Sequence, residues 1–153
     1  MLGHTTRLEI IEELISLLEG LDVKQVICGR AGSVQEEFIA LPDTNFPIIV
    51  LEAGLPQPEI KYSSRQQGTI DEVLSNLSID ISVYSRFVES PEEGDEGLSV
   101  ILQALWRGIC NSPNVGRALK ITPTFSPKIT YVDNYCYFTM NLVVRYNHDK
   151  DTI

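Results

Sequence analysis

Cysteine and histidine are scarce in this sequence. Its 153 residues include three cysteines, Cys28, Cys110 and Cys136, and two histidines, His4 and His148. The sequence has no CxxC pair and no histidine near a cysteine, which argues against a disulfide framework and against a structural zinc site. We expect the three thiols to be small buried hydrophobic groups in a reducing compartment.

Basic residues and long apolar runs are lacking as well. Twelve lysines and arginines stand against 21 acids, so the net charge is −9. This surplus of acid argues against a protein that grips nucleic acid over a broad basic surface and against docking on anionic lipid. No apolar run approaches the roughly 18 residues of a membrane span, and the N-terminus does not resemble a signal peptide. We therefore expect a protein without a membrane segment, made in the cytoplasm.

The first predicted element is an N-terminal helix. Thr6 and Glu9 have the spacing of a capping box, and Gly20 is the predicted C-cap. Apolar residues recur at steps of three and four along two neighbouring stripes, which together cover more than half of the helix surface. Either the fold buries both stripes, or a second protein covers one of them. For the second alternative, the candidate interface residues on this helix are Ile10, Leu14 and Leu17.

Strand-like segments follow the helix. A short β-like run at 24–30 and a helical turn at 35–40 precede the apolar run of residues 46–51, which predicts a strand buried on both faces. The alternation of apolar and polar residues over 77–83 predicts a strand with one buried face.

A long connection separates the last two of these strands. Residues 53–76 contain two prolines and a polar cluster, which is typical of a long loop or an extended arm. Tyr62 and Arg65 within it are candidate interface residues.

An acidic stretch opens the second predicted helix, whose apolar face runs from Leu98 to Ile109. Acids are favoured at a helix N-terminus by the helix dipole. The alternating carboxylate spacing of a calcium loop is absent. The stretch is therefore either a solvated acidic loop or an electrostatic surface that selects a partner or repels a polyanion. The candidate residues for such a surface are Glu89, Glu92, Glu93, Asp95 and Glu96.

The final third of the sequence is predicted to be β-structure. Strands are expected at 118–125, 128–132 and 135–146, followed by a polar, frayed tail at 148–153. A hairpin turn is expected at 133–134. The element order and the length predict a single α+β domain over residues 1–153, with a mainly antiparallel β-sheet packed against two principal α-helices.

Several aromatic residues lie outside the predicted core stripes. Trp106 is one position off the apolar face of its helix, so it either flanks the core or reaches a partner. Tyr131, Tyr135 and Tyr137 lie within seven residues, and they either form cross-strand pairs or anchor an interface.

Sequence motifs of enzyme chemistry are lacking too. There is no GxSxG, HExxH, P-loop or GxGxxG motif. His4 and His148 lie near opposite ends of the sequence in polar surroundings, without a visible partner that would orient a catalytic base. We therefore expect an interaction protein rather than an enzyme, with no cofactor and no metal site.

The order of these elements resembles that of the tail terminator (tail completion) proteins of long-tailed bacteriophages. The resemblance covers roughly Arg7 to Asn147 and is one of pattern rather than of a diagnostic motif. It rests on the N-terminal helix, the segment 46–52, the arm, the alternating segment 77–83, the helix around 98–105 and the closing segment 137–146.

This resemblance implies a structural virion protein of the phage tail, made in the bacterial cytoplasm. Family members form homohexameric rings that cap the head-proximal end of the tail tube, end its polymerisation and form part of the head–tail joining surface. The expected partners are other copies of the chain, the tail tube protein, a neck or connector protein and, in contractile tails, the sheath protein. DNA passes through such a ring without specific binding. The alternatives are another phage neck, head-completion or baseplate component, or a generic α+β interaction module.

Overall fold

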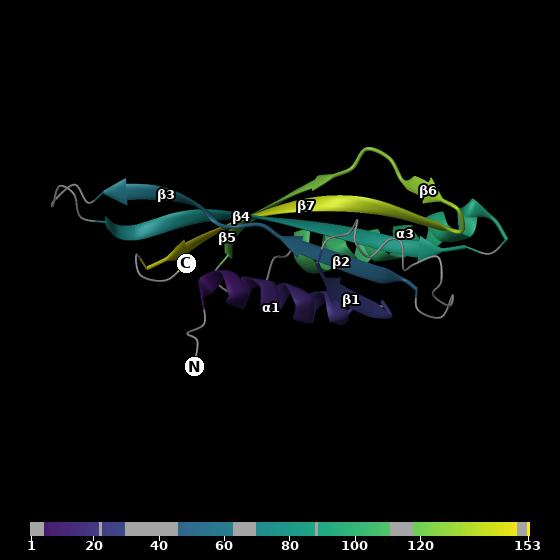
Figure 1. The fold of residues 1–153 in the computed structure, drawn as a ribbon, viewed down its shortest axis with the longest axis horizontal. Helices are drawn as coiled ribbons and strands as arrows, with labels where there is room; N and C mark the ends of the chain where they lie inside the picture. The colour runs from purple at the N-terminus through teal and green to yellow at the C-terminus, as the bar shows by residue number, and fades with distance from the viewer. Residues whose placement is uncertain are drawn as a thin grey trace.

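A mixed, mostly antiparallel β-sheet is the scaffold of the molecule, and two helices cover one of its faces (Figure 1). The computed structural model describes residues 5–21, 23–29, 46–62, 70–87, 89–110, 118–149 and 153. Within these residues the helices are α1 (Thr6–Glu19) and α3 (Pro91–Leu105). The strands are β1 (Gln25–Cys28), β2 (Ile48–Ala53), β3 (Gln57–Tyr62), β4 (Ile70–Arg86), β5 (Ala118–Phe125), β6 (Thr130–Val132) and β7 (Tyr135–His148). The predicted α+β class, with two principal helices on one sheet, is confirmed.

The long strands β4 and β7 form the centre of the sheet. The strand order is β1-β2-β4-β7-β5, with β3 also paired to β4 and β6 also paired to β7. Strands β2 and β3 therefore flank one side of the β4–β7 pair, and β5 and β6 flank the other. The β1–β2 pair is parallel, whereas the other described pairs are antiparallel.

The core lies between the helices and the adjoining face of the sheet. Residues 77–83 alternate as predicted, with their apolar side chains buried towards the helices. Strand β2 is buried on both faces, as its continuous apolar run predicts: Ile49 and Leu51 join this core, and Ile48 and Val50 join a smaller cluster on the opposite face. The spacing of apolar residues along the sequence therefore predicted that β2 has two buried faces and that residues 77–83 have one apolar face.

The cap of α1 differs by one residue from the prediction. The Thr5 hydroxyl accepts a hydrogen bond from the Leu8 N–H at 3.2 Å, and Thr6 is the first helical residue, buried in the fold. The capping box predicted at Thr6 and Glu9 is therefore wrong, because the neighbouring threonine has the extended backbone that an N-cap requires. Gly20 is the C-cap, as predicted.

The fold itself covers the inner stripe of α1. Ile10, Leu14 and Leu18 are at most 1% exposed and pack in the core against the sheet, while Leu17 and Ile11 are half-buried at its rim. The interface prediction is therefore wrong for Ile10 and Leu14, because core side chains cannot contact a partner without unfolding.

Two glycines set the close approach of α3 to the sheet, and a carbon added at Gly97 would lie 2.6 Å from the Ser85 hydroxyl oxygen. The helix starts at Pro91 and continues past Leu105 as a π-helical turn, Trp106–Cys110. A side-chain carbon added at Gly94 would lie 2.5 Å from the Cys136 Sγ and 3.0 Å from the Phe87 ring. Glycine therefore permits closer packing here than any other residue would.

The predicted arm is largely a β-hairpin. Strand β3 pairs with the first part of β4, and the two extend beyond α1 at one end of the molecule (Figure 1). Strand β4 therefore starts at Ile70, seven residues before the predicted strand. Residues 63–69, which include Arg65, lie outside the described residues, as does the predicted helical turn at 35–40.

The prediction of a frayed tail is wrong at two positions. His148 is the last residue of β7 and is buried. The Ile153 carbonyl accepts hydrogen bonds from the Arg7 N–H at 2.8 Å and from the Tyr146 hydroxyl at 3.3 Å. These bonds tie the last residue of the sequence to the start of α1.

Candidate interaction surfaces

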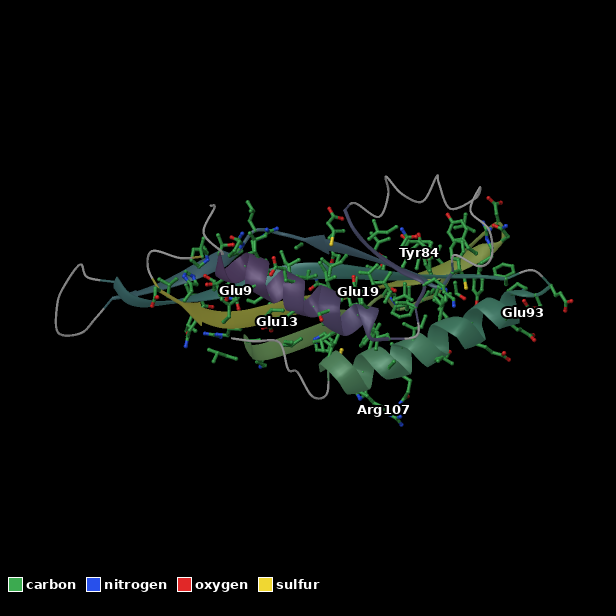
Figure 2. The ribbon with its side chains drawn as sticks, turned by 90° about the horizontal axis from the view of Figure 1, so that it is seen from below. Glu9, Glu13, Glu19, Tyr84, Glu93 and Arg107 are labelled. Carbon is green, nitrogen blue, oxygen red and sulfur yellow. The ribbon has the colours of Figure 1, made fainter. Side chains whose placement is uncertain are left out.

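The outward face of the helical layer is acidic. Each helix has four acids. The only base in either helix is Arg7, which lies in α1. Figure 2 shows this layer, with Glu13, Glu19 and Glu93 among the labelled side chains. The predicted electrostatic residues are all exposed: Glu89, Glu92, Glu93, Asp95 and Glu96. Within the described residues no group of three or more His, Cys, Asp or Glu side chains could hold a metal ion.

An aromatic cluster lies on the face of the sheet opposite the helices. Tyr84 and Tyr137 are cross-strand neighbours with ring centroids 5.0 Å apart, and Tyr135 is 6.1 Å from Tyr84. Beside them, the Arg86 guanidinium carbon lies 4.7 Å from the centre of the Phe46 ring. Cross-strand pairing therefore accounts for these tyrosines.

The predicted interface tyrosines thus have different environments. Tyr135 is 3% exposed, so the interface prediction is wrong for it, and burial raises the pKa of its hydroxyl. Tyr137 is half-buried. Tyr131 is exposed on β6, and its ring and that of Phe87 lie in an edge-to-face arrangement with centroids 6.4 Å apart. Tyr62 ends β3, and its side chain lies outside the description.

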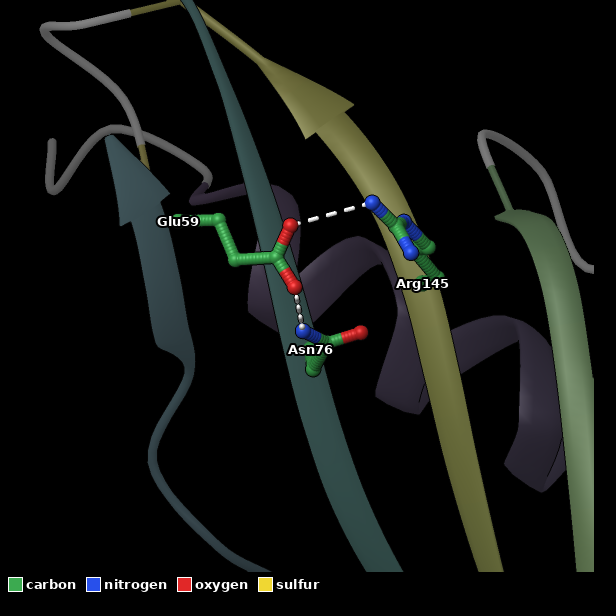
Figure 3. A network of polar contacts seen from close by, with 3 residues as sticks. All are labelled: Glu59, Asn76 and Arg145. Atoms are coloured by element: carbon green, nitrogen blue, oxygen red, sulfur yellow. Dashed lines mark hydrogen bonds and ion pairs between the residues drawn. The ribbon is translucent and has the colours of Figure 1, made fainter. Parts of the chain in front are cut away.

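Polar side chains occupy the same face of the sheet nearer the hairpin. A Glu59 carboxylate oxygen accepts a hydrogen bond from the Arg145 guanidinium at 3.0 Å, and the other accepts one from the Asn76 amide at 3.2 Å (Figure 3). The Asn141 amide donates to Ser78 at 2.7 Å and to Asp80 at 2.9 Å. The first network joins β3, β4 and β7 and so fixes the hairpin to the central strands.

A buried serine–histidine pair was not apparent from the sequence. The Ser75 Oγ and the His148 Nε2 are 2.7 Å apart, and the His148 Nδ1 lies 2.7 Å from the Asp149 carbonyl oxygen. A carbonyl oxygen only accepts, so Nδ1 donates to it, and in a neutral ring Nε2 accepts from the serine hydroxyl. Ser75 is fully buried, so this pair is closed to a substrate. The expectation that His148 has no partner to orient its ring is wrong, because β7 places the ring beside Ser75 in the buried part of the fold.

The three cysteines differ in exposure. Cys136 is fully buried, and burial, reinforced by the nearby Asp95 carboxylate, raises the pKa of its thiol to about 11. Cys110 is half-buried, and burial raises its pKa too. Cys28 is exposed, so the prediction of a buried thiol is wrong at that position.

A groove lies between α3 and the connection from β5 to β6. Its volume is about 410 Å³. Leu102 on α3 and Trp106 in the π-helical turn line the groove together with Phe125 and Ile129, and the Trp106 and Phe125 ring centroids are 6.5 Å apart. Trp106 is 46% exposed, which places this candidate residue at the surface rather than in the core. Trp106 could be singled out from the sequence, but its partners across the groove could not, because the two walls lie about 20 residues apart in the chain.

Comparisons with known proteins add no family assignment. No protein-family model matches the chain, and no curated protein matches it significantly. Neither helix within the described residues is long and apolar enough to cross a membrane.

Proposed function

We propose that the chain is a structural protein of a long-tailed phage virion, a tail terminator. In this role, copies form a ring that caps the head-proximal end of the tail tube, ends tube polymerisation and contributes to the surface that joins the head. The proposal keeps the partners expected from the resemblance: other copies, tube protein, a neck or connector protein and, in a contractile tail, sheath protein.

The observation that supports this proposal is the arrangement of the elements. Helix α1, strand β2, the hairpin extension, the long strand β4, helix α3 and the closing strands follow in the order on which the resemblance rests. They build a sheet with helices on one face and different strands along its two edges. A subunit with two different edges is suited to head-to-tail contacts that close into a ring.

The charge of the helical layer is compatible with a conduit for DNA. The acids of α1 and of the start of α3 give this layer an outward negative field. A passage with the same charge sign as DNA lets the polyanion move through without adhering. We propose that the acids from Glu89 to Glu96 face either this passage or a basic partner ring.

Electron micrographs of phage tails test the proposal. When the gene for this chain is inactivated in its phage, we expect tail tubes of uncontrolled, excessive length, because nothing ends polymerisation. Tails of normal length without heads would instead support the alternative of a neck or head-completion component. Tails of normal length with heads attached would contradict both roles.

Charge reversal tests the electrostatic part separately. Changing Glu92, Glu93, Asp95 and Glu96 together to lysine should slow DNA passage or impair head joining, measured as infectivity and as the fraction of tails with heads. The matched amide variant, with Gln or Asn at these positions, should show a smaller loss because it removes charge without reversing it. Unchanged infectivity in the lysine variant would contradict this part.

A further inference from the structure

The groove beside α3 is continuous with the acidic N-terminal end of this helix. Residues three and four positions apart lie on one face of a helix. One such stripe contains Glu92, Asp95, Ser99, Leu102 and Trp106. Its last three members line the groove, and the Ser99 hydroxyl donates to the Asp95 carbonyl oxygen at 2.8 Å. The apolar groove and the acids before it therefore belong to one surface.

Strand β6 forms the other side of this surface at its acidic end. Tyr131 pairs with Cys136 of β7, and it is 48% exposed. Partial burial, and after it the Asp95 carboxylate, raises the pKa of the Tyr131 hydroxyl, which places the carboxylate near this ring. A carboxylate beside an exposed aromatic ring favours a lysine or arginine side chain, through the ion pair and through the face of the ring. We call the groove together with Glu92, Asp95 and Tyr131 the α3 seam.

The α3 seam has opposite charges along its length. Glu92 and Asp95 are exposed, and neither forms an ion pair with another described residue. The groove itself is lined by Lys128, and Figure 2 shows Glu93 labelled near one end of the helix and Arg107 near the other. A base on a partner is therefore favoured at the N-terminal end of α3 and disfavoured in the groove. Charge thus determines which part of a partner lies at which end.

The groove supplies the apolar part of the α3 seam. Leu102, Trp106, Phe125 and Ile129 line it, and its volume of about 410 Å³ is within the range of sites that hold small apolar groups. Leu102 is 38% exposed and Trp106 is 46% exposed, so an occupant removes apolar surface of both from water. Tryptophan is among the residues that contribute most to binding at protein interfaces.

We propose that the α3 seam binds a segment of another protein in which an apolar anchor is followed by lysine or arginine. The anchor occupies the groove beside Trp106, and the base lies between Asp95 and Tyr131. The 11 positions from Asp95 to Trp106 (106 − 95) correspond to about 16 Å along the helix, which an extended partner spans with about five residues.

This inference goes beyond the proposed function. It favours a basic partner for the acids of α3, but it does not rest on the chain being a tail protein. Its test uses the purified chain in solution, so its failure is distinct from a failure of the tail phenotype.

Trp106 is the one tryptophan of the sequence, so tryptophan fluorescence reports on the groove directly. The probe is a capped synthetic peptide of leucine, phenylalanine, three serines and two lysines, used in this order and in reverse because charge does not fix the chain direction. We expect one of the two peptides to shift the emission to shorter wavelength, as the indole ring leaves water, with a Kd below about 1 mM. The absence of a shift with both peptides at this concentration would overturn the proposal.

Two matched peptides separate the basic and the apolar parts of the recognition. Replacing the lysines by glutamates should weaken binding at least about tenfold, because like charges then meet at Asp95. Replacing the leucine and the phenylalanine by serine should abolish the emission shift, because nothing then fills the groove. Equal affinities of the lysine and glutamate peptides, or a shift with the peptide that lacks apolar residues, would overturn the proposal.

Charge variants of the protein test the acidic end of the α3 seam. Glu92→Gln combined with Asp95→Asn should weaken binding of the lysine peptide about three- to tenfold, the range expected for one or two exposed ion pairs. The matched control is Glu12→Gln combined with Glu13→Gln, which removes the same charge from exposed positions of α1. Equal losses of affinity in the two variants would show that net charge attracts the peptide, and would overturn the proposal.

The groove is tested by Leu102→Ala, which keeps the fluorescent residue in place. Binding should weaken about fivefold or more. Val100→Ala is the control on the same helix, since Val100 is 64% exposed and lies outside the groove lining. Circular dichroism verifies that each variant is folded. Unaltered affinity in folded Leu102→Ala would contradict the assignment of the groove.

A second copy of the chain is the occupant from which a basic partner must be distinguished. We expect the emission of Trp106 without peptide to be independent of protein concentration. A shift to shorter wavelength that grows with protein concentration, together with larger species in sedimentation velocity, would show that copies of the chain cover the groove. That result would overturn the proposal.

Discussion

The two faces of the β4–β7 ladder have the same backbone but different chemistry. On the helix side, Ile79 lies opposite Leu142, and both side chains are fully buried. One position further along, Asp80 lies opposite Asn141 on the other side, where they form an exposed hydrogen bond. The hydrophobic contribution to stability is therefore concentrated on one face, and polar residues on the other are open to recognition.

The largest expected effect comes from breaking the helix side of this ladder. Leu142→Ala should lower the free energy of unfolding by about 2–5 kcal/mol, because it removes fully buried methyl groups and leaves a cavity. Asn141→Ala, at the next position, should cost about 1 kcal/mol or less, because its hydrogen bonds are exposed. Urea unfolding of both variants measures the difference. Equal losses of unfolding free energy in the two variants would show that the helix-covered face does not contribute more to stability than the polar face.

A smaller effect is expected from the close approach of α3. Gly94→Ala should destabilise the fold by about 1–3 kcal/mol, because the new methyl group meets the Cys136 sulfur and the Phe87 ring. Gly108→Ala is the matched control, since a carbon added there has no neighbour within 4 Å. Thermal unfolding compares the two variants. A Gly94→Ala variant as stable as the control would mean that α3 can move outward at little cost.

The smallest effect is expected on the polar face. The Glu59–Arg145 ion pair has side chains 47% and 40% exposed, so a double-mutant cycle with Glu59→Gln and Arg145→Met should give a coupling of about 0.2–1 kcal/mol. The coupling should shrink as salt is added, because exposed charges are screened. A coupling that is larger and insensitive to salt would place this pair closer to the core than its exposure indicates.

Sequence patterns predicted the fold better than the surfaces. Alternation over 77–83 and the apolar run at 46–51 report burial directly, because side-chain period and strand faces are linked. The buried side of α1 could not be predicted, since Leu14 and Leu17 are equally apolar and only the position of the sheet makes Leu14 the core residue. The groove could not be predicted either, because it depends on how α3 packs beside a distant turn.

The central ladder has a consequence for the order in which the chain folds. The nearest partners between β4 and β7, Arg86 and Tyr135, are 49 positions apart, and the farthest, Val73 and His148, are 75 apart (135 − 86 and 148 − 73). Strand β4 therefore has one long edge without its β7 partner until more than 40 further residues have been synthesised. Pairing across such separations is slow, since a long loop must close first. During synthesis this edge is the place where a chaperone would protect the chain from wrong strand pairing.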